Sequence, residues 1–234
     1  MRPLRGAISC LVAVVVLAGC ASTDITNRER YEGARLPEPD RIIVHDFTAD
    51  PAAVPPYSTF ADQLAAAPAP SPEQREAASR LGAQIATKLV VDLQGMGLPA
   101  VEAAGQPAPQ INDIVLRGYL VSVDEGGAGR RVLVGFGSGA AELRTAVEAY
   151  QMTTEGLRPL ARGETRSEGG KLPGMVLPAA VFAATASPIG LIVGGTAKAT
   201  GEVTGSETIE GAAERTADEI AAQLKTAAEE QGWI

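Results

Sequence analysis

The chain has 234 residues, with 20 basic and 28 acidic side chains and a formal net charge of −8. That length is enough for one domain with a hydrophobic core. An acidic protein gains nothing from phosphate backbones, so we expect no nucleic-acid partner. The chain has two cysteines, Cys10 and Cys20, and one histidine, His45, which argues against a conventional zinc site.

The first 19 residues have the layout of a secretory signal. Arg2 and Arg5 precede an uncharged stretch that runs from Gly6 to Gly19. Its apolar run is too short to cross roughly 30 Å of bilayer hydrocarbon, which needs about 20 apolar residues in a helix. The sequence Leu17-Ala18-Gly19-Cys20 resembles a bacterial lipobox, in which the cysteine thiol is acylated and the chain is cut before it.

The lipobox resemblance implies a covalent lipid on Cys20 and a mature chain that starts there. Stable anchoring in a membrane needs more than one acyl chain. We expect no cofactor other than this lipid. An ordinary cleaved signal with a chance cysteine is the alternative.

Ala21 resembles the residue after the cysteine in lipoproteins that are sent to the outer membrane, so we expect an anchor there, facing the periplasm. Loss of Arg2 and Arg5 leaves 18 basic residues against 28 acidic ones and moves the net charge from −8 to −10.

The segment after the signal predicts a tether, a strand and a loop. Residues 20–39 are polar and contain two prolines near their end, so they predict a lipidated cysteine followed by a tether. Residues 41–47 are apolar and β-branched, which predicts a first strand. Residues 49–72 are rich in proline and alanine and predict an exposed loop.

The clearest predicted element is an amphipathic helix that starts near residue 72. Ser71, Pro72 and Gln74 match an N-cap, a first helical residue and a capping box. Glycines at 95 and 97 are expected to end the helix. The apolar residues recur every four positions, as expected for one buried helix face: Leu81, Ile85, Leu89 and Leu93.

Strands follow the helix. Residues 114–123 and 131–136 are apolar, and residues 142–149 alternate, although Leu143, Val147 and Tyr150 would also fit a helix. A polar strand is expected near 160–167 and a closing helix over 208–231. The sequence therefore predicts one α+β domain over 40–234, with a small, mostly antiparallel sheet, two amphipathic helices packed on it and an apolar Ala/Gly-rich helical insert near 171–200.

Four segments of this chain resemble one known family, the proteobacterial lipoproteins called domain of unknown function 4410. The resemblance covers roughly residues 39–234. It implies a class of protein and an envelope location, and it carries no assigned activity. The segments that carry it are 41–47, 114–126, 130–137 and the terminal Gly232-Trp233-Ile234.

The sequence offers weak candidates for catalysis. Residues 135–140 match G-x-G-x-x-A, but a dinucleotide loop must open a helix, and a glycine-rich hairpin is the favoured interpretation here. Ser138 lacks the spacing of a nucleophile elbow. It would also need a base, and His45 is the sole histidine. His45 and Asp46 are neighbours in a predicted strand and would point to opposite faces. We therefore expect no catalytic residues, no metal site and no enzyme activity.

One long segment contains no charge. Residues 172–197 comprise 26 uncharged residues between Lys171 and Lys198, which is long enough to cross a bilayer. Three prolines argue against a single helix and favour two short arms. Small residues four apart would let two helices approach closely. The candidate membrane or helix-packing residues are Ala180, Ala184, Gly190, Leu191, Val193 and Gly194.

Two functional hypotheses follow. The first is a non-catalytic envelope lipoprotein, held to a membrane by lipid, that binds a protein partner or supports an assembly; the apolar segment would then be a buried hairpin or a loop. The alternative is a membrane-inserting, oligomeric component of a secretion or envelope complex, in which each protomer contributes a hairpin from residues 171–200. An envelope protein and a second copy of the chain are the expected partners.

Overall fold

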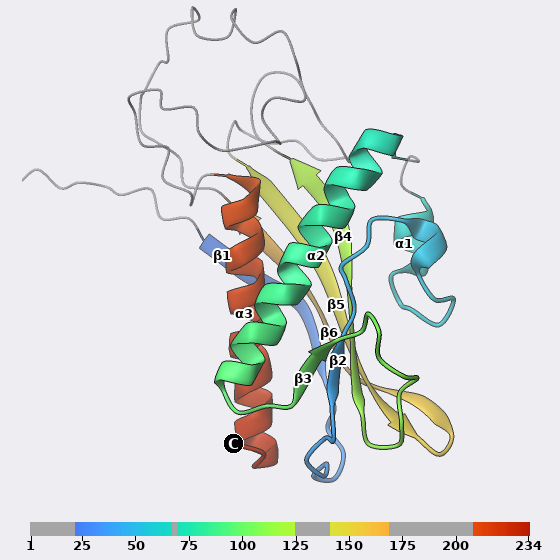
Figure 1. Ribbon diagram of the computed structural model, residues 1–234, viewed down its shortest axis with the longest axis vertical. Coiled ribbons are helices and arrows are strands. Elements are labelled where there is room, and N and C mark those ends of the chain that lie inside the picture. Colours follow the sequence, from blue (N-terminus) through green and yellow to red (C-terminus); the bar gives the residue numbers. More distant parts are fainter. Residues whose placement is uncertain (1–21, 67–69, 125–140, 169–207) are drawn as a thin grey trace, which may run out of the picture.

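Six strands form one open, mixed sheet, and two long helices cover one of its faces (Figure 1). The computed structural model describes residues 22–66, 70–124, 141–168 and 208–234. The order across the sheet is β1-β6-β5-β4-β2-β3. The strands are β1 (Ser22–Arg30), β2 (Ile42–Val44), β3 (Ala100–Glu102), β4 (Ile114–Asp124), β5 (Glu142–Thr153) and β6 (Gly156–Glu168). The helices are the 3-10 turn η1 (Pro51–Ala53), α1 (Ala61–Ala65), α2 (Pro72–Gly95) and α3 (Ile209–Gln231).

The sheet has an antiparallel half and a parallel half. Strands β1, β6, β5 and β4 pair antiparallel, whereas β2 pairs parallel with both β4 and β3. Helix α2 is the crossover that parallel β2 and β3 require. The α+β class and the two helices packed on a sheet, expected from the sequence, are confirmed.

Both long helices begin at the caps that their sequences specify. Ser71 accepts a hydrogen bond from the backbone of Gln74, and the Gln74 side chain accepts one from the backbone of Ser71, which completes the predicted capping box. Thr208 caps α3 through the backbone N–H of Gly211. Gly97 and Gly232 follow the helices with positive φ, the conformation that ends a helix and that glycine adopts without strain.

The main core lies between the sheet and the two helices. Leu81, Ile85, Leu89 and Leu93 are buried along one face of α2, as their spacing predicted. Helix α3 is lined mostly by alanines, which allow it to lie close to α2 and to the sheet. Residues 142–149 form a strand rather than a helix, with Leu143 and Ala149 in this core.

The segment after β2 is more ordered than the exposed loop predicted for residues 49–72. It contains η1 and α1, and Phe60 and Leu64 are buried against the side chain of Tyr119 on the second face of the sheet. These two apolar residues are four positions apart, so one short helix turns both toward the sheet. The proline-rich composition hid this second, smaller core.

The tether predicted for residues 20–39 is wrong over residues 22–30. These residues form β1, the edge strand that pairs with β6. Polar residues suit this position because the partner strand is also polar: the hydroxyl of Thr23 lies 2.8 Å from that of Ser167. Farther along, Leu36 is buried, and the side chain of Gln231 accepts a hydrogen bond from its backbone. The segment is therefore part of the domain.

Three predicted features lie outside the described residues. They are the signal with Cys20, the strand expected at 131–136 with its glycine-rich continuation, and the apolar insert near 171–200. Within the described ranges, no helix is both long enough and apolar enough to cross a membrane.

Candidate functional site

Four strands end in register at one end of the sheet, which we call the Ser22 end. Ser22 of β1 is paired with Glu168 of β6, which is paired with Glu142 of β5, which in turn is paired with Asp124 of β4. Cys20 precedes Ser22 by two residues in the sequence. The lipid expected on Cys20 would therefore be attached beside the folded sheet.

Helix α3 begins at the same end of the molecule. The Ser167 hydroxyl lies 2.7 Å from that of Thr216, and Arg215 donates to the carbonyl oxygen of Glu168 at 3.2 Å. These contacts hold the first turns of α3 against the end of β6, opposite the C-terminus (Figure 1). Glu168 and Thr208 are the described residues that flank 169–207, so the uncharged segment leaves and re-enters the domain at the Ser22 end.

The candidate residues Ala180, Ala184, Gly190, Leu191, Val193 and Gly194 lie within 169–207, outside the described residues, as does Ser138 in the glycine-rich segment. Their predicted roles remain predictions. The structure does define where the segments that contain them are attached.

A buried carboxylate that the sequence analysis missed holds the second face of the sheet together. Glu148 of β5 is 2% exposed. The hydroxyls of Tyr119 and Tyr150 donate to one of its oxygens at 3.1 and 2.8 Å. The backbone and hydroxyl of Thr59 donate to the other at 2.9 and 2.7 Å. One side chain thus joins β4, β5 and the loop before α1.

The electrostatics of this cluster favour a structural role. Burial acts to raise the pKa of Glu148, but hydrogen bonds from Thr59, Tyr150 and Ser58 outweigh it and hold that pKa below its usual value. Burial and the neighbouring carboxylate raise the pKa of Tyr150 and bring that of Tyr119 to about 12. At neutral pH the carboxylate is ionised and the phenols are protonated. The cluster therefore supplies fixed donors and acceptors, and it is poorly suited to proton transfer.

Beside this cluster the surface is hollowed into a groove of about 740 Å³, which we call the tyrosine groove. Tyr31, Tyr57 and Tyr150 contribute to its walls together with Arg162. The rings of Tyr57 and Tyr150 meet edge to face with their centroids 5.5 Å apart. Tyrosine and arginine are enriched at protein interfaces, because they combine a large apolar area with hydrogen-bonding groups.

His45 follows β2 and is half-buried. Burial, and then the positive charge of Arg117, lower the pKa of His45 to about 4. Its neighbour Asp46 is exposed. The histidine is therefore neutral at physiological pH.

Lowering the pH from 7 to 4.5 should destabilise the wild-type protein more than a His45→Gln variant. The folded-state pKa lies below the ordinary value of 6.5, so the unfolded chain takes up the proton first. Stability is therefore lost as the pH falls from about 6.5 toward 4. Urea titrations of both proteins at pH 7, 5.5 and 4.5 would measure the difference. Equal losses of unfolding free energy in the two proteins between pH 7 and 4.5 would contradict the assigned environment of His45.

The described part of the chain brings no three His, Cys, Asp or Glu side chains into a metal-binding group. The fold and surface define a small α+β domain with one open sheet, two long helices on one face and a tyrosine-lined groove. The chain belongs to the family described as domain of unknown function (DUF4410), which matches residues 42–186. The family predicted from the sequence is thus confirmed. No curated protein matches the sequence.

Distant structural likenesses include two to PelC dodecamers from Paraburkholderia phytofirmans. A leucine-to-methionine variant of PelC is 16% identical, with a TM-score of 0.35 over 65% of this chain and 85% of that one. PelC in another crystal form is 13% identical, with a TM-score of 0.37 over 65% and 86%. At these scores the likeness is too distant to bear on function or assembly.

Proposed function

We propose that this protein is a non-catalytic lipoprotein of the bacterial envelope, anchored through Cys20, that binds a protein partner or supports an assembly. The observation that carries the proposal is the position of β1. This strand begins two residues after Cys20 and pairs with β6 from Ser22 to Arg30, with one register shift after Thr26. Lipid on Cys20 would therefore hold the sheet by the Ser22 end, close to the membrane surface, with little freedom between anchor and domain.

This orientation would leave the tyrosine groove open to a partner. The groove is lined by Tyr31, which follows the far end of β1, and by Leu157 and Pro159, which lie near the β5–β6 turn. These residues lie toward the end of the strands opposite Ser22. A partner in the periplasm could therefore reach the groove while the Ser22 end faces the bilayer. Ala21 supports placement in the outer membrane.

Replacing Cys20 with serine should abolish lipidation and move the protein from the membrane fraction to the soluble fraction. Serine cannot accept the thioether-linked diacylglycerol, and acyl chains supply the stable hold. Labelling of Gram-negative cells with alkyne-palmitate, followed by fractionation, measures both effects. Cys10→Ser is the matched control, because Cys10 lies in the signal and should not affect the label. An unlabelled wild-type protein would overturn the proposal.

The alternative of a membrane-inserting, oligomeric component is favoured by one observation: the uncharged segment departs from Glu168, the residue paired with Ser22. If Cys20→Ser stays in the membrane and is released only after Leu191 and Val193 are changed to aspartate, this second function would replace the first.

A further inference from the structure

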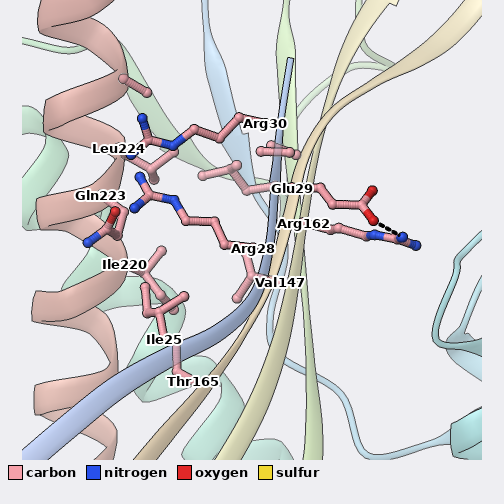
Figure 2. A pocket seen from close by; sticks show the side chains of 15 residues that line it. Ile25, Arg28, Glu29, Arg30, Val147, Arg162, Thr165, Ile220, Gln223 and Leu224 are labelled. Atoms are coloured by element: carbon pink, nitrogen blue, oxygen red, sulfur yellow. Dashed lines mark hydrogen bonds and ion pairs between the residues drawn. The ribbon is translucent and has the colours of Figure 1, made fainter. Parts of the chain in front are cut away.

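A small apolar pocket lies between α3 and the strands β1, β5 and β6. Its volume is about 100 Å³. Figure 2 shows Ile25, Val147, Ile220 and Leu224 around the space between helix and sheet. The pocket is partly open to solvent, and β1, one of the strands that line it, is the edge strand of the sheet. It lies on the face of the sheet opposite the tyrosine groove.

The sequence leaves this space open because small residues face one another across it. Ala149 and Gly163 line it from the sheet, and Ala227 lines it from α3. Protein interiors are normally filled to high density by interlocking side chains, so facing small residues leave a gap. The edge of the pocket is also irregular: the register of β1 with β6 shifts between Thr26 and Glu29, and Asn27 has a φ of 51°.

Two arginines lie at the mouth of this apolar pocket. In Figure 2 the side chains of Arg28 and Arg30 extend from β1 toward α3, whereas Glu29 points to the other side and pairs with Arg162. Arg30 is 3.1 Å from Glu230 in an exposed ion pair, which is weak enough to exchange. The Arg28 side chain makes no hydrogen bond or ion pair with any described residue. Two guanidinium groups thus flank an apolar opening on an acidic protein.

We propose that this pocket binds a single-chain anionic lipid. The end of the alkyl chain would occupy the apolar space, and a carboxylate or phosphate head would accept hydrogen bonds from Arg28 and Arg30. Guanidinium groups are well matched to both kinds of head. A complete ligand site is usually about 300–1,000 Å³, so a pocket of this size takes the last few carbons while the rest of the chain crosses the mouth. The proposal does not depend on the anchor at Cys20.

Displacement of the fluorescent fatty acid cis-parinaric acid tests the proposal on residues 21–234, which contain every described element. Dodecanoate and dodecyl phosphate, below their micellar concentrations, should displace the probe, whereas dodecyltrimethylammonium should not. Removing one methylene from the part of the chain inside the pocket should lower affinity about fourfold. A preference for dodecanoate identifies fatty acid as the source of the ligand, and a preference for dodecyl phosphate identifies a lysophospholipid.

Two variants separate pocket binding from adsorption elsewhere. Gly163→Val should lower the affinity at least tenfold by filling the pocket, and the added Cβ would make only ordinary contacts, the nearest 3.5 Å from Ile25. Ala227→Leu fills the pocket from α3 and provides the same test of binding if Gly163→Val folds poorly. Arg28→Gln should weaken the binding of anions at least tenfold. Arg75→Gln, an exposed arginine at the start of α2, is the matched control for net charge.

Binding that is unchanged in Gly163→Val, Ala227→Leu and Arg28→Gln would show that the probe binds elsewhere and would overturn the proposal. The absence of any displaceable binding at 100-fold excess of dodecanoate and dodecyl phosphate would do the same.

Discussion

Replacing Gly82 with alanine should lower the free energy of unfolding by about 3 kcal/mol, the upper part of the range for overpacked sites. A Cβ at this position in α2 would lie 1.8 Å from the carbonyl oxygen of Phe47 and 2.7 Å from its carbonyl carbon. Both atoms are backbone, so the conflict can be relieved only by moving the chain after β2 away from the helix. That movement would also weaken the hydrogen bond from the Phe47 N–H to the Gly82 carbonyl, now 3.3 Å long.

Phe47 cannot move far because a second glycine fits against its ring. A Cβ on Gly118 of β4 would lie 2.3 Å from the ring carbon Cδ1 of Phe47. The side chain is 2% exposed and belongs to the main core. The residue is therefore held between a helix and a strand, and a displacement at Gly82 is transmitted to the centre of the sheet.

Gly95→Ala is the control for the Gly82 variant. Gly95 is the last residue of α2, and a Cβ there meets nothing within 4 Å. Alanine is favoured over glycine in a helix by about 0.5–1 kcal/mol, so this variant should be slightly more stable than the wild type. Urea unfolding followed by circular dichroism compares all three proteins. A Gly82→Ala protein as stable as wild type would show that the chain after β2 does not approach α2 so closely.

Replacing Glu148 with alanine should also cost about 3 kcal/mol of unfolding free energy. The change leaves the buried hydroxyls of Tyr119 and Tyr150 without their acceptor, whereas the two donors of the exposed Thr59 can turn to water. Each buried donor that loses its partner costs roughly 1–3 kcal/mol, although water entering the space offsets part of the sum. Glu148→Gln keeps one oxygen acceptor and should cost less than half as much.

The difference in unfolding free energy between the wild type and Glu148→Gln should depend on pH. The folded-state pKa of Glu148 lies below the ordinary value of 4.5, so its contribution is fully present above about pH 4.5 and is lost as the pH falls through the folded-state pKa. The stability gap between wild type and Glu148→Gln should therefore narrow below pH 4.5. Glu76→Ala, an exposed residue of α2, is the control and should change stability by less than about 0.5 kcal/mol. A gap that does not depend on pH would contradict an ionised Glu148.

The elements predicted correctly are those that local sequence determines. The capping box at Ser71 and the four-residue spacing from Leu81 to Leu93 specify α2 without reference to any other part of the chain. The same holds for α3, from the Thr208 cap to Gly232. Strand β5 was less certain from sequence because its apolar spacing also fits a helix, and its pairing with β4 and β6 decides the outcome.

The features that were missed depend on distant partners. Strand β1 is polar and had no strand signal of its own; it is a strand because β6 offers it polar partners. The burial of Glu148 depends on the register that brings Tyr119 beside it and on a loop that supplies Thr59. Neither could be inferred without the three-dimensional pairing. A glutamate two residues before a tyrosine in an alternating strand was the one available signal, and it is a weak one.

The pairing of β1 with β6 also bears on the order in which the protein folds. Thr23 and Ser167, which touch across these strands, are 144 residues apart in the chain. Closing so long a loop is entropically costly and slow compared with forming α2 or the β5–β6 hairpin. Strand β1 can be completed only after most of the protein has been synthesised and the rest of the sheet has formed. Strand β1 would thus be the last strand to form, and if Cys20 is lipidated as proposed, this late ordering would keep the cysteine accessible to the modifying enzyme.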